Sequence, residues 1–427
     1  MEFPGCRPFE GASQGSRIPR MWPCSLPDGQ RDALDRALRE CRTPAYLFDA
    51  RAAVRCAALL EPLRREAGLR VLYAVKALPL GAMAAALAPA LDGFAVSSRN
   101  EAELARRHLR PGQTLHLTSP GLRADDTPRI GALCSHVAFN SLGQAARLAG
   151  ALPPGCSPGL RVNPRCSSLD DPRYDPCRPA SRLGEPVEVV EELLRRRPDR
   201  LGPLRGVHFH VSFAAAGYEP VLSALERVEP LLERWPGGLD WINLGGGVLP
   251  ARVSRWDDLR AAVLRLRSRG LEVFHEPGKG LVGECGRLVT SVVDRFTRDG
   301  TEILVLDTSV AHHPEVFEYG RAPALANEDD EGRHRVLLSG ASCLAGDLFG
   351  EYRFDRVPEV GERLVFTGVG AYSLVKANRF NGIPLPEVWL LEAGGGARCL
   401  GRDGPGDFLR RWDGDNESEC LREVRGR

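Results

Sequence analysis

The sequence predicts an α/β protein: a closed (β/α)8 barrel of the TIM type, followed by a C-terminal antiparallel β domain. Two observations lead to this prediction. Eight short apolar runs alternate with helix-like stretches from about residue 71 to residue 278. Parallel strands that alternate with helices are typical of βα units, and eight units close a barrel. Beyond about residue 288, strand-like runs follow one another across Gly- and Pro-containing turns, which indicates a separate β domain.

The strands and helices of the predicted barrel can be placed in chain order. The strand runs are VLYAVKA, GFAVSS, TLHLTSP, HVAFNS, GLRVNP, GVHFHVS, WINLGGG and LEVFHEPG. Helical spacing of apolar residues is clearest in EAELARRHL, SLGQAARLAGAL, YEPVLSALERVEPLLERW and DDLRAAVLRLRSRG. The C-terminal ends of the strands are therefore expected to form one rim, where such barrels carry their functional groups.

The β domain and the chain ends complete the predicted organisation. LVTSVVDRFT, TEILVLDTSV, HRVLLSGASC and ERLVFTGVGAY are read as strands of this domain, and TPAYLFDA (43–50) could join them. The two ends are rich in polar and turn-forming residues, which predicts loosely ordered segments. We expect an N-terminal extension (1–42), a barrel (43–287), a β domain (288–400) and a C-terminal tail (401–427).

The composition is that of an ordinary globular protein. The 427 residues are 43% hydrophobic and 26% charged, with a formal net charge of +1. This balance offers no basic surface for a nucleic acid, and no apolar run reaches the roughly 20 residues that span a bilayer. Twelve cysteines are scattered without CxxC pairs or Cys/His clusters of metal-ligand spacing. Reduced thiols, no metal site and a cytoplasmic location are therefore expected.

One lysine stands inside a run that otherwise reads as a buried strand. The chain has 57 Lys and Arg residues, and only Lys76, Lys279 and Lys376 are lysines. Codon bias accounts for much of this excess of arginine, yet a lysine retained in VLYAVKALPL can do what arginine cannot. An amine in an apolar site can lose its proton and attack a carbonyl group.

Several other groups are expected at the same rim as Lys76. His210 ends the sixth strand, the glycines of LGGG end the seventh, and Glu276 ends the eighth. Taken singly, a triple glycine usually marks a turn, a histidine among apolar residues is usually packed, and a glutamate after a strand can be a surface residue. Together they suit pyridoxal 5'-phosphate (PLP): the glycines could cradle its phosphate, the lysine could bind its aldehyde, and the carboxylate could pair with its ring nitrogen.

The motifs of the chain resemble the signature set of the fold-type III PLP-dependent decarboxylases, which include ornithine, arginine and diaminopimelate decarboxylases. These motifs are YAVKAL, HFHV, LGGG, HEPGK, SCLAGD and GAYSLVKANRFNG. FNSLGQ, GLRVNP, YDPCRPASRLG, SCLAGDLFGEYRFD and NRFNGIPLP are most similar to carboxynorspermidine decarboxylases. The resemblance runs from about Thr43 to Leu390. It implies decarboxylation of an amino acid at Cα in polyamine biosynthesis, with an amine or polyamine and CO2 as products.

The resemblance also implies how the cofactor is held. Lys76 would bind PLP covalently, Glu276 would bond the protonated pyridine nitrogen, and His210 would stack on the ring. Glycines, a lysine and a tyrosine would bind the phosphate, namely Gly245, Gly246, Gly247, Gly278, Lys279 and Tyr372. Lys279 stands where the broader family has arginine, which keeps a point charge and loses the bidentate fork.

Cys343 and Asp347 match the CxxxD element of the family. The resemblance implies that both side chains reach across a two-fold homodimer interface into the partner's active site. Cys343 would protonate the carbanion that remains after CO2 departs, while Asp347 and Tyr372 would contact the substrate. Outside this motif, the same cysteine would be read as a small buried residue.

The chain departs from the family pattern at two places. After His210 it reads VSFAAAG, so Phe213 stands where the broader family has a serine that helps to hold phosphate. In DTSVAHHPEV, His312 and His313 are adjacent. These two histidines are either substrate-side residues or exposed loop residues.

Other functions stay open at the level of the sequence. The chain could decarboxylate a different amino acid in a specialised pathway. It could also be a non-catalytic regulator that keeps the PLP barrel, or a racemase. Lys76, Glu276 and Cys343 together favour the decarboxylase, because a regulator would be expected to lose the lysine or the cysteine.

Overall fold

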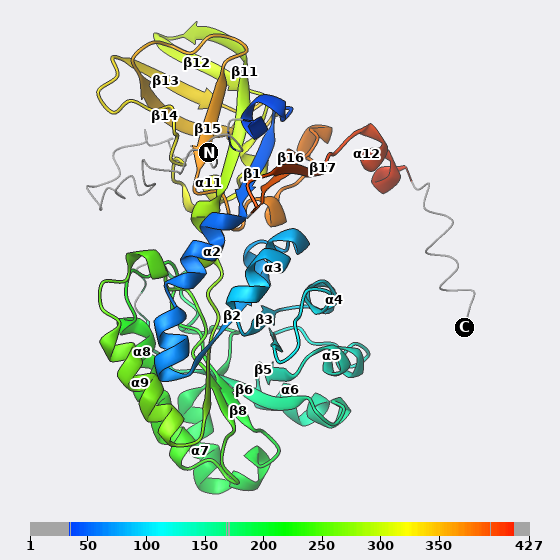
Figure 1. Cartoon of the computed structure of the whole chain (residues 1–427), viewed down its shortest axis with the longest axis vertical. Coiled ribbons are helices and arrows are strands. Elements are labelled where there is room, and N and C mark those ends of the chain that lie inside the picture. The colour runs from blue at the N-terminus through cyan, green and yellow to red at the C-terminus, as the bar shows by residue number, and fades with distance from the viewer. Residues whose placement is uncertain (1–33, 35, 168, 170, 393, 414–427) are drawn as a thin grey trace, which may run out of the picture.

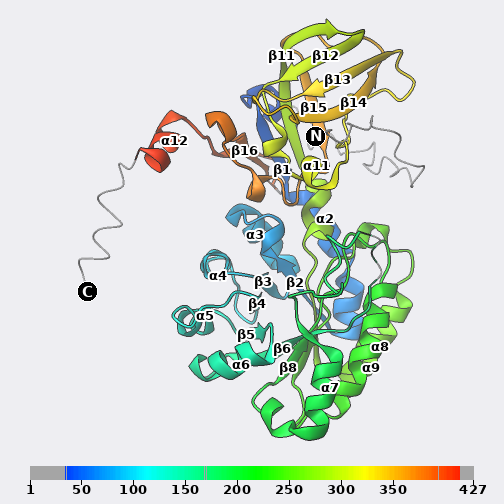
Figure 2. The same ribbon diagram turned by 180° about the vertical axis from the view of Figure 1, so that it is seen from behind.

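The computed structural model describes residues 34, 36–167, 169, 171–392 and 394–413. They form two lobes, a barrel with helices around it and a β-rich lobe above it (Figure 1). The view from behind shows the same two lobes, with α2 at the junction between them (Figure 2). No helix in the described part of the chain is long and apolar enough to cross a membrane.

The barrel contains eight parallel strands, as predicted. They are β2 (Leu69–Ala74), β3 (Gly93–Val96), β4 (Thr114–Ser119), β5 (His136–Phe139), β6 (Ser157–Asn163), β8 (Gly206–His208), β9 (Trp241–Asn243) and β10 (Glu272–His275). Each strand pairs in parallel with the next of this series, and β10 pairs with β2, which closes the barrel. The predicted closed eight-stranded barrel is therefore confirmed.

Helices cover the outside of the barrel. They are α2 (Ala50–Ala58), α3 (Gly81–Leu87), α4 (Arg99–Arg106), α5 (Thr127–Leu133), α6 (Leu142–Leu148), α7 (Val187–Arg196), α8 (Glu219–Glu233) and α9 (Asp257–Ser268). The apolar stripe of each amphipathic helix faces the strands: in α9, for example, Leu259, Val263 and Leu266 are buried. The short strand β7 (Glu185–Pro186) pairs with the end of β6.

Large side chains fill the inside of the barrel below the rim. Trp241 and Phe274 are fully buried there, and Phe274 packs on His116 with ring centroids 4.3 Å apart. Glycines on the neighbouring strands make room for the indole, because a Cβ at Gly206 would lie 1.9 Å from Trp241 Cε2. The inside of the barrel is thus a packed core rather than a channel.

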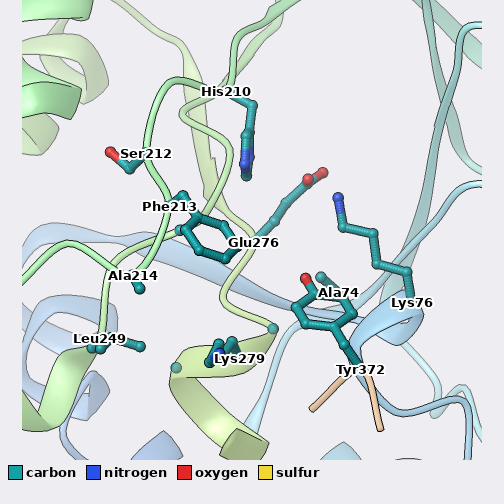
Figure 3. Close-up of a pocket in the computed structure, with 13 residues that line it drawn as sticks. Ala74, Lys76, His210, Ser212, Phe213, Ala214, Leu249, Glu276, Lys279 and Tyr372 are labelled. Atoms are coloured by element: carbon teal, nitrogen blue, oxygen red, sulfur yellow. The ribbon is translucent and has the colours of Figure 1, made fainter. Parts of the chain in front are cut away.

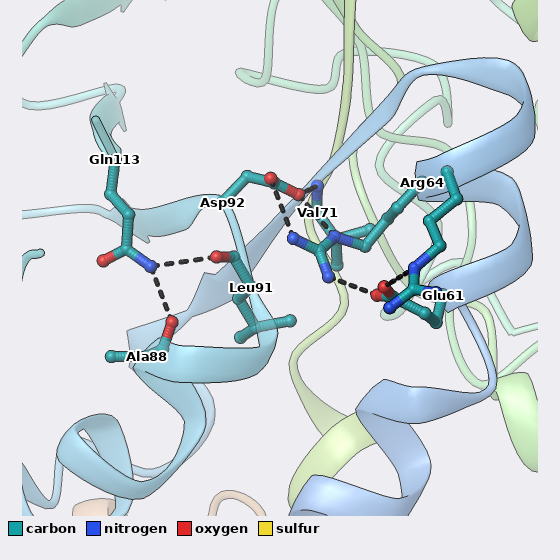
Figure 4. Close-up of polar contacts among 8 residues, drawn as sticks. Glu61, Arg64, Val71, Ala88, Leu91, Asp92 and Gln113 are labelled. Atoms are coloured by element: carbon teal, nitrogen blue, oxygen red, sulfur yellow. Dashed lines mark hydrogen bonds and ion pairs between the residues drawn. The ribbon is translucent and has the colours of Figure 1, made fainter. Parts of the chain in front are cut away.

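A polar cluster fixes the strand that carries the candidate lysine. Asp92 accepts hydrogen bonds from the guanidinium of Arg64 and from the backbone N–H of Val71, in β2 (Figure 4). Arg64 is also paired with Glu61. These contacts tie the helical turn before β2 to the loop before β3, and so they fix the N-terminal end of the strand that leads to Lys76.

The second lobe is one mixed sheet. Its strands are β1 (Ala45–Asp49), β11 (Gly286–Arg298), β12 (Thr301–Leu306), β13 (His334–Ser339), β14 (Leu348–Phe354), β15 (Arg363–Thr367), β16 (Glu387–Leu391) and β17 (Ala397–Gly401). Most pairs are antiparallel, but β1–β16 and β12–β13 are parallel. The predicted domain is present, and it differs from a purely antiparallel sheet because long connections separate these two strand pairs in the chain.

Strand β1 comes from the segment 43–50 and lies in the second sheet, between β11 and β16. The short helix α10 (Lys279–Val282) follows β10 at the rim of the barrel, and α11 (Glu315–Tyr319) and α12 (Pro405–Trp412) follow strands of the second lobe. Within the predicted extension, Ala37 and Cys41 are buried against the sheet, whereas residues 1–33 and 35 lie outside the described residues. In the predicted tail, α12 is helical, and residues 414–427 lie outside the described residues.

Candidate active site

A cavity opens at the C-terminal ends of the barrel strands (Figure 3). Its walls come from the loops after β2, β8, β9 and β10 and from Tyr372 of the second lobe. Seven predicted site residues line it: Lys76, His210, Gly247, Glu276, Gly278, Lys279 and Tyr372. The strand order therefore brings together side chains that are up to about 300 positions apart in the sequence.

Lys76 lies in a single helical turn, Val75–Ala77, directly after β2. Its neighbours in the turn are buried, whereas the Lys76 side chain extends into the cavity, toward the Glu276 carboxylate (Figure 3). The protein that surrounds the cavity lowers the pKa of the Lys76 amine by desolvation, and the charge of Glu276 opposes this shift only in part. A larger fraction of the amine is therefore unprotonated than in a free lysine, as a nucleophilic amine requires.

Glu276 follows β10 and faces Lys76 across the cavity (Figure 3). Asn243 Nδ2 donates a hydrogen bond to Glu276 Oε1 over 2.7 Å, and His208 Nε2 lies 3.6 Å from Oε2. Burial raises the pKa of Glu276, but His208, Lys76 and Asn243 together outweigh it, and the net pKa is below the ordinary value. The carboxylate is thus held ionised inside the barrel.

His210 projects into the cavity above Glu276 (Figure 3). The backbone N–H of Gly246 donates to His210 Nδ1 over 3.0 Å, so this nitrogen is an acceptor and the ring proton lies on Nε2. Burial first, and then the charge of Lys76, lower the pKa of His210 well below its ordinary value. A neutral imidazole of fixed orientation is suited to stacking on a flat ring.

The three glycines after β9 have different roles. The N–H of Gly245 donates to Asn243 Oδ1 over 3.0 Å, and that of Gly246 is bonded to His210. Both amides are thus engaged inside the protein, and only Gly247 lines the cavity. Gly247 has φ +91°, and a Cβ there would lie 1.9 Å from the carbonyl oxygen of Ser212. Phosphate binding by the triple glycine stays a prediction, and of the three residues Gly247 is the one that lines the cavity.

Lys279 begins the short helix α10 at the opposite end of the cavity from Lys76 (Figure 3). Its Nζ is 2.9 Å from Glu315 Oε2, and it lies over the rings of Phe213 and Tyr319 at 5.8 and 6.0 Å. Phe213, at the position where the family has serine, also stacks on Tyr174 at 5.3 Å. An aromatic cluster (Tyr174, Phe213, Tyr319) thus borders the cation that is expected to meet the phosphate.

Cys343 lies in the loop after β13 and is exposed, and it is not among the residues that line the cavity of its own chain. Asp347, in the same loop, is buried and accepts hydrogen bonds from the N–H of Val310 and from the N–H and hydroxyl of Ser342. These donors show that Asp347 orders its loop, and its contact with the substrate in the partner's active site stays a prediction.

His312 and His313 are both buried, so their interpretation as exposed loop residues is wrong. Thr308 Oγ1 contacts His312 Nδ1 at 3.0 Å, and Ser373 Oγ contacts His313 Nδ1 at 2.8 Å. Neither histidine lines the cavity. Their contact with substrate stays a prediction, and in this structure both histidines are packed inside the second lobe.

Sequence reasoning missed His208, Asn243 and Glu315. His208 stands two positions before His210 in HFH, and alternate residues of a strand share one face. This two-residue period predicts that the side chain of His208, like that of His210, points into the barrel. Glu315 gave no such signal, because its partner Lys279 is 36 residues away in the chain.

In this barrel, a lysine follows the first strand and a carboxylate that faces it follows the last. This arrangement is typical of enzymes in which a lysine amine binds a carbonyl compound covalently. Residues 45–370 match the family described as pyridoxal-dependent decarboxylase, C-terminal sheet domain. The chain belongs to this family, and it is a pyridoxal-dependent carboxy-lyase.

Two relatives and one solved structure are similar to most of this chain. A carboxynorspermidine/carboxyspermidine decarboxylase of Herminiimonas arsenicoxydans is 31% identical, over 84% of this chain and 96% of that protein. A carboxyaminopropylagmatine decarboxylase of Synechocystis is also 31% identical, over 83% of this chain and 91% of that protein. The crystal structure of carboxynorspermidine decarboxylase complexed with norspermidine, from Campylobacter jejuni, matches with a TM-score of 0.76 and 28% identity, over 87% of this chain and all of that chain.

Proposed function

We propose that the chain decarboxylates the amino-acid end of a carboxylated polyamine. The observation that carries this proposal is Lys76 facing the ionised Glu276 across a cavity at the barrel rim. The relatives support the substrate class, because the names of their substrates each describe a long amine with a carboxylated end. We expect a related substrate here, in the cytoplasm, where the free thiols of the nine described cysteines are stable.

The residues present fit PLP as the cofactor. Lys76 offers an amine of lowered pKa for the aldehyde, and Glu276 offers an ionised carboxylate for the ring nitrogen. At the other end, a side chain at Gly247 would collide with the backbone of Ser212, so this position of the cavity wall requires glycine. The phosphate would be held there by Gly247, Gly278 and Lys279, with Tyr372 at the edge of the cavity.

Bound PLP supplies an aldehyde that joins the substrate amine and a ring that accepts the electrons of the breaking bond. The protein's own groups do the rest. Lys76 would hold the cofactor covalently through its amine, and the Glu276 carboxylate would pair with the ring nitrogen and keep it protonated. His210 would pack on the ring face and fix its plane. Cys343 of the partner subunit would supply the proton that the substrate carbon takes up.

The exposed position of Cys343 supports a homodimer with shared sites. Large apolar side chains gather in and around its loop with 41–70% of their surface exposed, namely Phe317, Leu344, Leu348, Val375 and Phe380. Phe317 lies 3.8 Å from the Cβ position of Gly346, and Asn381 accepts a hydrogen bond from the N–H of Cys343. An apolar surface of this kind suits burial against a second copy of the chain.

Release of CO2 from a panel of amino acids tests the substrate. The panel contains carboxynorspermidine, carboxyspermidine, carboxyaminopropylagmatine, ornithine, lysine, arginine and diaminopimelate. We expect the highest kcat/KM for one of the first three and none for any of them in Lys76→Ala. A higher kcat/KM for ornithine or diaminopimelate would contradict the proposed substrate class.

Mixing two inactive variants tests the shared site. Lys76→Ala and Cys343→Ala should each be nearly inactive alone. If sites are shared, mixed dimers contain one site with both intact residues, so activity returns after subunit exchange. Activity that stays absent, in a mixture shown by mass spectrometry to contain heterodimers, would refute the shared site.

A further inference from the structure

Two side chains that do not line the cavity, those of His208 and Asn243, face the carboxylate of Glu276. His208 ends β8, Asn243 ends β9, and Glu276 directly follows β10. The strand register places His208 beside Asn243, and Asn243 beside Phe274, two positions before Glu276. Asn243 contacts one carboxylate oxygen at 2.7 Å, and His208 faces the other at 3.6 Å.

The orientation of each partner is fixed. Asn243 Oδ1 accepts the N–H of Gly245, so its amide N–H₂ must point toward Glu276. The His208 nitrogen that faces the carboxylate is Nε2, and its Nδ1 is buried without a hydrogen-bond partner among the described residues. A neutral His208 therefore gains from carrying its proton on Nε2, because that N–H faces the negative charge.

Both partners favour the ionised form of Glu276, because Asn243 donates a hydrogen bond to one oxygen and His208 Nε2 faces the other at 3.6 Å. Protonation of the carboxylate would remove the negative charge that these two groups face and so weaken both contacts. The other charged groups around Glu276 are Lys76, from the turn after β2, and Arg161 on β6, and both are cations. His116 on β4 lies deeper in the barrel, stacked on His136 at 4.0 Å.

We propose that His208 is a positioning residue, whose imidazole keeps the Glu276 carboxylate ionised and aimed so that the proton shared with the PLP ring stays on the ring nitrogen. This inference rests on the proposed function. His208 does not line the cavity, and it acts through Glu276 alone. Its unpartnered Nδ1 is the cost of directing Nε2 at the carboxylate.

The test reads the ring nitrogen directly. The protein is loaded with PLP labelled with 15N at that position, and the 15N resonance reports whether the nitrogen is protonated. In the parent protein we expect a protonated nitrogen. In His208→Phe the resonance should move toward the unprotonated position, because burial then raises the pKa of Glu276 without the opposing imidazole. His208→Gln should retain the parent resonance, since its amide N–H₂ can also donate.

Kinetics provide a second readout. We expect kcat of His208→Phe to fall roughly 10- to 100-fold, the effect of losing one contact to a charged group, with little change in KM. In a Glu276→Gln background, His208→Phe should cause no further loss. His136→Phe is the matched control, since it replaces another buried barrel histidine that does not contact Glu276, and it should keep the parent 15N resonance.

Each outcome decides the inference. A parent-like 15N resonance in His208→Phe that binds one PLP per chain would overturn it, and so would an equal loss of kcat in the Glu276→Gln background. If His208→Phe does not fold, the resonance in His208→Leu decides by the same criterion. If borohydride reduction of the parent leaves no PLP on Lys76, the proposed function falls and takes this inference with it.

Discussion

Replacement of Lys279 measures how the protein holds the phosphate end of its cofactor. We expect Lys279→Met to weaken PLP binding, because a methionine of similar length removes the only lysine that lines this end of the cavity. A charge-assisted contact contributes about 1.5–3 kcal/mol, which corresponds to roughly 10- to 100-fold in Kd. In this variant Glu315, whose side chain is only 9% exposed, loses the cation that it pairs with. A second variant that removes the charge of Glu315 is therefore needed as a control.

The paired variant Glu315→Gln gives the opposite expectation. Its carboxylate lies 2.9 Å from the Lys279 ammonium and therefore near the incoming phosphate. Two like charges about 6 Å apart repel by roughly 3 kcal/mol at an effective dielectric constant of about 20, and the partial exposure of Lys279 reduces this to about 1–2 kcal/mol. Glu315→Gln should thus tighten PLP binding by about 10-fold.

Equilibrium dialysis of the apoprotein against PLP, and in parallel against pyridoxal, separates the phosphate contact from general damage. Pyridoxal has the same ring and aldehyde but lacks the phosphate, so its affinity should be equal in the parent, Lys279→Met and Glu315→Gln. A loss of affinity that is equal for both ligands in Lys279→Met would refute the phosphate contact. It would assign Lys279 to the support of α11 through Glu315.

Three further outcomes follow from single positions. Lys76→Ala should give no PLP adduct in mass spectra after borohydride reduction, whereas Lys376→Ala should keep the adduct. Because the pKa of Lys76 is lowered, adduct formation by the parent protein should reach half its maximum at a lower pH than adduct formation by free lysine. Gly206→Ala should lower the free energy of unfolding by about 2–3 kcal/mol in denaturant titrations, since the new methyl group would overlap the indole of Trp241. Cys343→Ala should keep the adduct and the melting temperature but lose kcat, and unchanged kcat would exclude its role in protonation.

The features that the sequence predicted are those that local pattern determines. All eight barrel strands were readable because each is a short apolar run between amphipathic helices. Lys76 and Glu276 could be placed at one rim because each ends such a run, and parallel strands of a barrel all end at the same side. Their facing positions in the cavity follow from the closure of β10 on β2.

The missed features depend on contacts between distant segments. The sequence offers LGGG as three equivalent amides, but Asn243 and His210 take two of them, and neither bond can be read from a glycine run. Asp347 is similar, because its donors at Val310 and Ser342 meet it only after the sheet has formed. Parallel pairing of β12 with β13 likewise depends on the path of a long connection rather than on a residue pattern.

The side chain of Phe213 packs in a group of aromatic rings, and these neighbours explain a phenylalanine at this position. As a substitution for serine, it removes a hydroxyl from the phosphate end. In the structure its ring stacks on Tyr174 from the loop after β6, and Tyr319 of α11 meets both rings edge-on, with centroids 4.7 and 5.8 Å away. The same ring lies under the Lys279 ammonium.

The cluster thus joins the barrel to the second lobe beside the lysine that is expected to bind phosphate. The hydroxyl of Tyr174 donates to the carbonyl oxygen of Glu318, which adds a polar contact between the same two segments. A serine at position 213 could donate one hydrogen bond, but it could not make these ring contacts. We therefore expect the phosphate end of the site to depend more on the charge of Lys279, which this cluster borders, than on a hydroxyl donor.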